Sequence, residues 1–441
     1  MTTPKYTPQV EELMQLVSPR VGLIRSLTRG ARGPVEPNPP ILYQAVLSHF
    51  DFKRAKLIER ASAGKGETES EAIGGAIGEA VERYCASHLD IKSFRRGTWK
   101  DVGTDAVPPI DCVLYSERQY AARTLPYAPW QEAIPLDWLP VRELPSGKEV
   151  LAPASLIYLS YHTERFEEHL AQITSSGLAA GPDLETAVRG GLYELIERDG
   201  FLIYWMNRLP AAEVDFAGAG GLAADIRSHY LRFGVQTRVF NITTDLPVYV
   251  MMAISLNPAG KGPASMVALG CNPDPALAVR KALLEICQIR PGNARRYQEE
   301  EPQKRLRKYE DVRTLEDHSA FFMVPEHLTE LEFLLDNGRT QKLEDLPSYS
   351  HGSVKEDLDS CVAALKAAGC RIVYADLTTP DLTDFKIRVV RTIATGLQPI
   401  HFGNGHERLG GKRLYEVPRL LGFTDQATTE TSLNPCPHPI A

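Results

Sequence analysis

The chain has 441 residues, of which 43% are hydrophobic and 24% are charged, a composition typical of a globular protein with a full core. Its formal net charge of −7 leaves no basic surplus for a phosphate backbone, which argues against nucleic acid as a partner. It contains neither a signal-peptide pattern nor a run of about 18 uncharged apolar residues, so we expect a cytoplasmic protein with no membrane partner.

The sequence patterns of several common kinds of functional site are absent. The seven cysteines are scattered without a C-x-x-C pair, and the eleven histidines form no H-E-x-x-H, which argues against a disulfide framework or a zinc site. Neither a G-x-x-x-x-G-K-[ST] loop nor a G-x-S-x-G elbow occurs. Nucleotide chemistry in this chain would therefore need another kind of site.

The N-terminal third predicts strands more than helices. Residues 1–60 predict an amphipathic start and then strands near 21–27 and 41–50, and we interpret them as a lead-in to the main domain. Residues 97–160 combine Pro, Trp and Tyr with short apolar runs, which indicates strands joined by irregular segments. The apolar runs of 97–160 also suggest a homodimer.

The remainder alternates between helices and strands. We expect a helix at 222–233, a hairpin within 237–256 and a strand at 265–270. After a charged insertion at about 292–352, a helix at 354–368 precedes strands at 371–377 and 385–393. The main domain is predicted to span residues 61–434, followed by a proline-rich tail at 435–441.

One helical pattern occurs three times, with an alanine seven residues before a glutamate. Each copy follows a glycine-containing loop with a residue that can cap a helix, such as Thr68 or Asp183. The copies are Ala72–Glu82, Ala187–Glu197 and Ala278–Gln288.

Residues three apart in an α-helix point to the same side. Two copies therefore present a pair of carboxylates, and the third presents one carboxylate and one amide. The pairs are Glu79 with Glu82, Glu194 with Glu197, and Glu285 with Gln288.

A single E-x-x-E-R sequence is ordinarily a solvated surface helix with local ion pairs. Three copies argue against that interpretation here, as do the glycine pairs at 74–75 and 190–191. Because glycine destabilises a helix interior by about 1 kcal/mol relative to alanine, these pairs indicate helices that pack closely against something else.

Closely packed carboxylates repel one another unless a cation neutralises them. Mg²⁺ prefers oxygen ligands and commonly binds one or two carboxylates together with nucleotide phosphates. Basic residues beside the motifs are then candidates for phosphate oxygens. These are Arg83, Arg198, Lys281 and Arg290.

The segments around the motifs resemble the YcaO superfamily, specifically the azoline-forming cyclodehydratases of thiazole/oxazole-modified microcin biosynthesis. The resemblance extends from about residue 60 to the C-terminus and implies an α/β YcaO fold, with mixed sheets and packed helices that carry the repeated E-x-x-E motifs. The segments that carry it are GKGETESEAIGGAIGEAVERY, SSGLAAGPDLETAVRGGLYELIERDGFLIYW, ALGCNPDPALAVRKALLEICQIR, GLQPIHFG, LGGKRLYEVPRLLGF and PCPHPIA.

This resemblance implies an ATP-dependent enzyme that converts Cys, Ser or Thr residues of a ribosomally made precursor peptide to thiazoline or oxazoline, by phosphorylating the backbone amide oxygen. It implies ATP held through Mg²⁺ by the motif glutamates. The implied metal ligands are Glu79, Glu82, Glu194, Glu197 and Glu285, and further cofactor-binding candidates are Ser176, Arg198, Lys281 and Arg290.

The end of the chain, Pro435–Pro439, matches the alternating-proline ending of azoline-forming members. The resemblance implies that this tail reaches the active site, with Pro437 and Pro439 holding it and the carboxylate of Ala441 assisting proton transfer. Composition alone favours a disordered end instead. We interpret His438 as part of the tail and not as a general base.

No segment resembles the E1-like, leader-peptide-binding part that some relatives carry. We therefore expect a separate E1-like (ThiF-like) partner protein, and an FMN dehydrogenase in the same pathway. Two alternatives stay open. One is thioamide or amidine formation, against which the proline tail argues, and the other is a non-catalytic scaffold, which the five retained glutamates disfavour.

Overall fold

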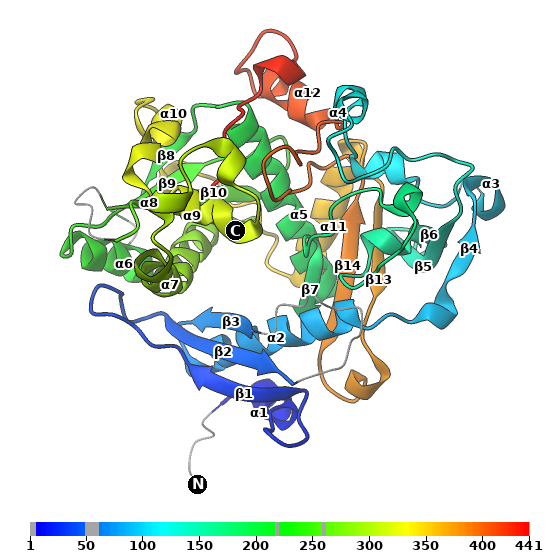
Figure 1. The fold of residues 1–441 in the computed structure, drawn as a ribbon. Coiled ribbons are helices and arrows are strands. Elements are labelled where there is room, and N and C mark those ends of the chain that lie inside the picture. The colour runs from blue at the N-terminus through cyan, green and yellow to red at the C-terminus, as the bar shows by residue number, and fades with distance from the viewer. Residues whose placement is uncertain are drawn as a thin grey trace. The chain divides into compact units, whose positions relative to one another are not determined.

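The computed structural model describes residues 6–48, 61–103, 105–216, 218, 220–257 and 262–440. The chain divides into two compact units, and Figure 1 labels their elements. Unit 1 comprises Met1–Gly30, Ile41–Leu195 and Gly352–Leu397, and unit 2 comprises Ala31–Pro40, Ile196–His351 and Gln398–Ala441. In the described part of the chain, no helix is both long and apolar enough to cross a membrane.

Unit 1 contains two sheets whose neighbouring strands are all antiparallel. Its strands are β1 (Ile24–Arg29), β2 (Ile41–Leu47), β3 (Ala61–Gly66), β4 (Arg95–Gly97), β5 (Leu136–Leu144), β6 (Glu149–Pro153), β7 (Leu178–Gly181), β13 (Ile372–Asp376) and β14 (Arg388–Ala394). The smaller sheet has the order β1-β2-β3. The larger has the order β4-β5-β13-β14-β7, with β6 beside β5.

One helix of unit 1 connects the cores of both sheets. Its helices are α1 (Pro8–Leu13), α2 (Glu69–Ser87), α3 (Trp99–Val102), α4 (Glu117–Ala122), the first half of α5 (Leu184–Met206) and α11 (Val354–Ala367). Helix α2 contacts β2 and β3 of the smaller sheet and β7 and β14 of the larger. Its buried side is mostly small, with Ala72, Ala76 and Ala80 fully enclosed, so strands can approach it from both sheets.

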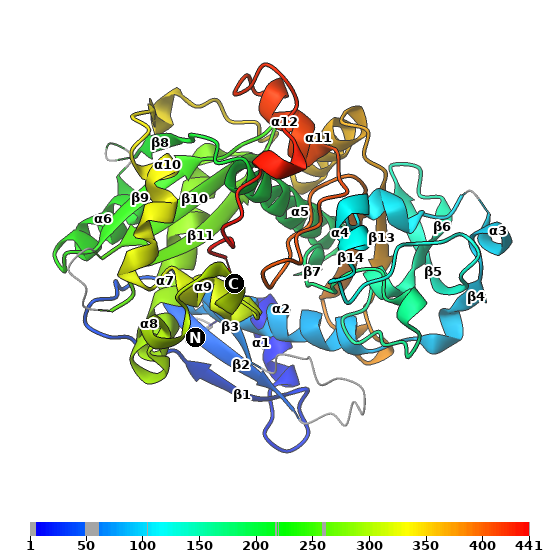
Figure 2. The same ribbon diagram turned by 45° about the horizontal axis from the view of Figure 1, so that its top comes forward.

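Unit 2 is built around one sheet with the order β11-β10-β9-β8-β12. Its strands are β8 (Ala212–Asp215), β9 (Gln236–Asn241), β10 (Tyr249–Leu256), β11 (Ser265–Asn272) and β12 (Thr340–Lys342), and only β12 lies parallel to its neighbour. Its helices are the second half of α5, α6 (Gly221–Leu231), α7 (Pro275–Glu300), α8 (Pro302–Arg305), α9 (Leu315–Phe321), α10 (Glu332–Leu335) and α12 (Arg413–Leu420). Helix α7 packs on β10 and β11 (Figures 1 and 2).

The periodic segments fold as predicted. The predicted helices at 222–233 and 354–368 correspond to α6 and α11, and the predicted hairpin is the antiparallel pair of β9 and β10. The predicted strand at 41–50 begins as β2, and its last two residues lie outside the described part of the chain. The predicted boundaries at residues 60 and 434 and the predicted homodimer remain predictions.

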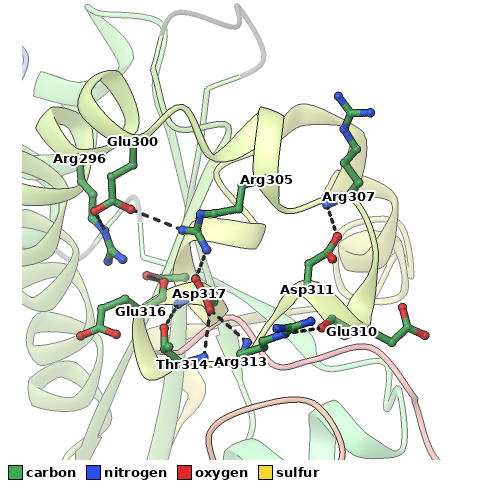
Figure 3. Close-up of polar contacts among 11 residues, drawn as sticks. Arg296, Glu300, Arg305, Arg307, Glu310, Asp311, Arg313, Thr314, Glu316 and Asp317 are labelled. Atoms are coloured by element: carbon green, nitrogen blue, oxygen red, sulfur yellow. Dashed lines mark hydrogen bonds and ion pairs between the residues drawn. The ribbon is translucent and has the colours of Figure 1, made fainter.

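The charged segment after residue 291 is ordered around one buried carboxylate. Helix α7 continues through Pro291 to Glu300, and Figure 3 shows Arg305 between Glu300 and Asp317. Asp317 is 5% exposed and accepts the backbone N–H groups of Arg313 at 3.1 Å and Thr314 at 3.0 Å. The carboxylate therefore fixes the start of α9 to the preceding segment.

Candidate functional site

The three motif copies lie on α2, α5 and α7, and each of these helices follows a strand at one end of a sheet. These strands are β3, β7 and β11, and two residues join each strand to its helix. The second of the two residues is Thr68, Asp183 or Asp274, which accepts a backbone N–H group of the first helical turn. The predicted caps Thr68 and Asp183 are thus confirmed.

In copies one and three, a strand glycine lies against the backbone of the motif helix. A Cβ atom on Gly64 would lie 2.0 Å from the carbonyl oxygen of Ala72, and one on Gly270 would lie 2.3 Å from that of Ala278. Both alanines occupy the first position of the motif. Close strand-to-helix packing therefore accounts for the small residues that recur in these copies.

The leading glutamates of copies one and two turn back toward the preceding strand. The Ala63 N–H donates to Glu79 Oε2, and the Gly177 N–H donates to Glu194 Oε2, each at 3.0 Å. These amides lie in or beside β3 and β7, the end strands of their sheets. The main chain thus fixes the orientation of both carboxylates in the same way.

Glu82 lies one turn after Glu79 on α2 and interacts electrostatically with Glu194 of α5. The pKa of Glu82 is raised to about 8, mainly by burial and further by the carboxylates of Glu194 and Glu79, against the attraction of Arg83. Arg391 on β14 acts in the opposite direction. Unit 1 therefore brings together Glu79, Glu82 and Glu194, which we call the glutamate group.

The glutamate group fits Mg²⁺, because Glu194 and Glu79 lie close enough to Glu82 to repel it and a cation would neutralise that repulsion. Among the described residues, no three His, Cys, Asp or Glu side chains form a ready-made metal centre. Mg²⁺ does not require one, since it usually takes one or two carboxylates and completes its octahedron with phosphate oxygens and water. The group is thus suited to a metal ion that arrives with phosphates.

Two further residues of unit 1 adjoin this group. Ser176 is buried and immediately precedes Gly177, whose amide binds Glu194. Arg391 is also buried, and its guanidinium donates to the carbonyl oxygens of Leu156 at 3.2 Å and Thr174 at 2.8 Å. Sequence analysis missed Arg391, because its position depends on the pairing of β14 with β7 and no local pattern marks it.

The other predicted site residues belong to unit 2. Exposed Lys281 donates to the carbonyl oxygen of Cys271 at 3.1 Å. Arg290 is 3% exposed, lies 3.4 Å from the carboxylate of Glu36 and donates to Ser255 Oγ at 3.0 Å. Arg290 is thus held in a buried ion pair. The predicted phosphate contacts of these two residues, and the metal or phosphate roles of Glu197, Arg198 and Glu285, remain predictions.

A buried ion pair follows directly after Glu197 and Arg198 on α5. Asp199 is fully buried, and Arg413 at the start of α12 donates to both of its oxygens, at distances from 2.8 to 3.2 Å. Arg413 also pairs with Asp245 at 2.6 Å. The sequence analysis did not single out Asp199, because it follows the motif like one more charged residue of the helix. An acidic residue within an otherwise apolar helical stretch is nevertheless a signal of a buried ion pair.

The C-terminal tail is ordered as far as it is described. Residues 436–440 are buried, and Pro437 and Pro439 lie among them, whereas Pro435 is exposed. The expectation of disorder drawn from composition is therefore wrong for this segment, because side chains elsewhere in unit 2 supply its hydrogen bonds. Ala441 lies outside the described residues.

The chain is similar to known proteins in sequence and in fold. A family model described as YcaO cyclodehydratase, ATP- and Mg²⁺-binding, matches residues 63–398. An uncharacterized protein of Methanothermobacter thermautotrophicus is 27% identical over 355 residues, which are 79% of this chain and 84% of that protein.

Two solved structures share the fold. A heterocyclase in complex with substrate and cofactor is 27% identical, with a TM-score of 0.81 over 98% of this chain and 57% of that one. YcaO from Methanopyrus kandleri, bound with AMPPCP and Mg²⁺, is 22% identical, with a TM-score of 0.63 over 85% and 86% of the two chains. This chain thus spans little more than half of the heterocyclase, and the predicted α/β YcaO fold is confirmed.

Proposed function

Because the chain belongs to the YcaO cyclodehydratase family, which binds ATP and Mg²⁺, we propose that it is an ATP-dependent cyclodehydratase of a ribosomally made peptide. A Cys, Ser or Thr side chain of the peptide closes onto the preceding backbone carbonyl. ATP supplies the phosphoryl group with which the carbonyl oxygen leaves as phosphate. The product is a thiazoline or oxazoline ring, and each ring removes one water from the peptide.

The observation that carries this proposal is the glutamate group. Its carboxylates lie close enough for Glu194 and Glu79 to raise the pKa of Glu82, and backbone amides set the orientation of Glu79 and Glu194. Such a site is pre-organised for a divalent cation bound to phosphates, since little side-chain freedom remains to be lost. We propose that Glu79, Glu82 and Glu194 bind Mg²⁺, together with Glu197 of copy two and Glu285 of copy three.

The remaining chemistry is assigned to positively charged groups and to the tail. In this proposal Arg198, Lys281 and Arg290 contact phosphate oxygens, and Ser176 offers a hydroxyl beside Glu194. Ring closure releases protons from the attacking side chain and from the amide nitrogen. The carboxylate of Ala441, carried by a tail that Pro437 and Pro439 stiffen, is proposed to accept one of them.

Substrate recognition is proposed to need further proteins. The chain spans 57% of the similar heterocyclase, so that protein has parts with no counterpart in the matched region. We propose a separate E1-like protein that binds the leader of the precursor peptide, and an FMN dehydrogenase that acts later in the pathway. We place the reaction in the cytoplasm and propose that the chain works as a homodimer.

Product mass tests this function. The chain is incubated with Mg²⁺, ATP, an E1-like partner and a Cys/Ser/Thr-rich precursor peptide, and the mass of the peptide is measured by mass spectrometry. We expect a loss of one water per modified residue and release of one ADP and one phosphate per ring. Exchange of oxygen for sulfur would indicate thioamide formation instead, and an unchanged peptide with unused ATP would support a non-catalytic scaffold.

A further inference from the structure

The described end of the tail is held at two places in unit 2. The first is the C-terminal half of α5, where the Asn434 N–H donates to the carbonyl oxygen of Met206 at 2.7 Å. The indole Nε1–H of Trp205 donates to the carbonyl oxygen of Cys436 at 2.9 Å. Trp205 is 1% exposed, so this bond is shielded from water.

The second place is α9, beside which the last described part of the tail lies in both ribbon views (Figures 1 and 2). His318 of α9 is fully buried, and its ring stacks on that of His438 with 4.1 Å between centroids. The start of α9 is itself fixed by Asp317, through Arg305 and two backbone amides (Figure 3). The histidine thus sits on a rigid support.

Both ring nitrogens of His318 have assigned roles. The Gly403 N–H donates to Nε2 at 2.8 Å, and a backbone amide can only donate, so Nε2 carries no proton. The proton must therefore be on Nδ1, which donates to the carbonyl oxygen of His438 at 2.8 Å. A neutral His318 connects the tail to the loop at residues 401–403.

His438 completes the arrangement with its own two nitrogens. Its Nε2 lies 2.7 Å from the carbonyl oxygen of His401 and acts as the donor, because the Ile440 N–H donates to Nδ1 at 3.4 Å. His438 is 1% exposed, and its ring is neutral in this pattern. The last described residues are thus fixed by one side chain of the tail and one side chain of α9.

We propose that His318 is a positioning residue that seats the C-terminal tail, and that Trp205 ties the seated tail to α5, the helix that carries Glu197. The bond from Nδ1 to His438 holds the tail, and the bond to Nε2 holds the loop that supports it. That a seated chain end serves ring formation rests on the proposed function. The role of His318 and Trp205 in holding the tail follows from the described contacts, and it can be tested without measuring any reaction.

Two substitutions at this position separate the two bonds. In His318→Asn the side-chain amide reaches the position of Nδ1 and can still donate to His438. In His318→Gln the carbonyl oxygen reaches the position of Nε2, so the loop contact is kept and the tail contact is lost. Both variants remove the ring and its stacking, which makes each one the control for the other.

Hydrogen exchange of the C-terminal peptide, residues 434–441, measures the seat in the full chain. We expect exchange about tenfold faster in His318→Gln than in His318→Asn, the effect of one buried hydrogen bond. Trp205→Phe, which removes only the indole donor, should also accelerate exchange. Equal exchange rates in the two His318 variants, or no effect of Trp205→Phe, would overturn the proposal.

Activity provides a second readout that a merely structural role would not produce. We expect His318→Gln to lower kcat for ring formation while KM for ATP stays unchanged, and His318→Asn to restore part of kcat. After removal of residues 437–441, the two variants should have the same kcat. If the wild-type chain forms no ring, the proposed function fails, whereas the exchange comparison still decides whether His318 seats the tail.

Discussion

Glu82 and Asp317 are both carboxylates on helices, but their surroundings move their pKa values in opposite directions. Burial, together with the charges of two neighbouring glutamates, raises the pKa of Glu82 to about 8. Burial alone would also raise that of Asp317. The hydrogen bonds from Arg305 and from two backbone amides outweigh burial and lower it below its ordinary value.

This difference is the one we expect between a structural carboxylate and one that binds a cation. The donors around Asp317 satisfy both of its oxygens within the folded chain, so the carboxylate needs nothing else. Glu82 instead lies among the like charges of Glu194 and Glu79, and Arg83 and Arg391 are opposing charges beside it. Such an arrangement costs stability and is expected where a cation binds.

The largest expected effect is on ATP use. Glu82→Gln keeps the shape of the side chain and removes its charge, so we expect ATP consumption to fall about 100-fold, the usual scale for a disturbed metal site. The matched control is Glu185→Gln, an exposed residue in the first turn of α5. Steady-state ATPase rates of both variants make the comparison, and equal rates would remove Glu82 from the site.

Asp317→Asn should instead act on folding. One of the two carboxylate oxygens becomes an NH₂ group in asparagine, and an NH₂ group cannot accept the hydrogen bonds that this oxygen receives. We therefore expect the free energy of unfolding to fall by about 2 kcal/mol. Urea unfolding measures it, with the exposed neighbour Glu316→Gln as control. A variant as stable as wild type would show that the Asp317 carboxylate does not have the structural role that distinguishes it from Glu82.

Acid should loosen the tail before it unfolds the protein. Burial lowers the pKa of His318 from 6.5 to about 4, although the bond to His438 and the charge of Asp317 oppose this. When the tail detaches and His318 becomes solvated, its pKa returns to about 6.5. The tail is therefore fully protected from exchange above pH 6.5, and this protection is lost as the pH falls toward 4.

At one pH unit below the ordinary pKa, the protection factor of residues 434–441, which corrects for the pH dependence of intrinsic amide exchange, should be about tenfold lower than at neutral pH. His401 and Arg198 face His438, and burial lowers its pKa as well, so His318→Asn should weaken the dependence without abolishing it. Exchange in α7 serves as the reference for global unfolding. A constant protection factor of the tail across this range would contradict the proposal that neutral His318 holds it in place.

The smallest expected effect is on stability, and its sign distinguishes the two kinds of carboxylate. Without Mg²⁺, Glu82→Gln removes repulsion within the glutamate group and should raise the free energy of unfolding by about 1 kcal/mol at pH 8. Thermal unfolding in the presence of a chelator measures it. A destabilised variant would place Glu82 with Asp317 among the structural carboxylates.

The sequence predicts those parts of the fold that depend on local pattern. Helices α6 and α11 and the hairpin of β9 and β10 follow from periodicity, and Thr68 and Asp183 cap the helices they precede. The threefold motif also predicts that several carboxylates gather, and in the structure Glu79, Glu82 and Glu194 lie close enough to interact.

Features that depend on distant partners were not predictable. Arg391 reaches the glutamate group through strand register, and Arg290 is engaged by Glu36, which precedes it by more than 250 residues. The tail has no regular structure, as its prolines require, but its order comes from Trp205 and His318. The composition of a segment gives no information about the distant residues that will pack around it in the fold.

Calorimetric titration of a non-hydrolysable ATP analogue into the wild-type chain, Glu82→Gln and Glu185→Gln tests the central claim most directly. The glutamate group predicts binding to wild type and to Glu185→Gln that requires Mg²⁺, and at least tenfold weaker binding to Glu82→Gln. Binding that is independent of Mg²⁺, or equally tight in all three proteins, would contradict the assignment of these carboxylates to the metal–nucleotide site.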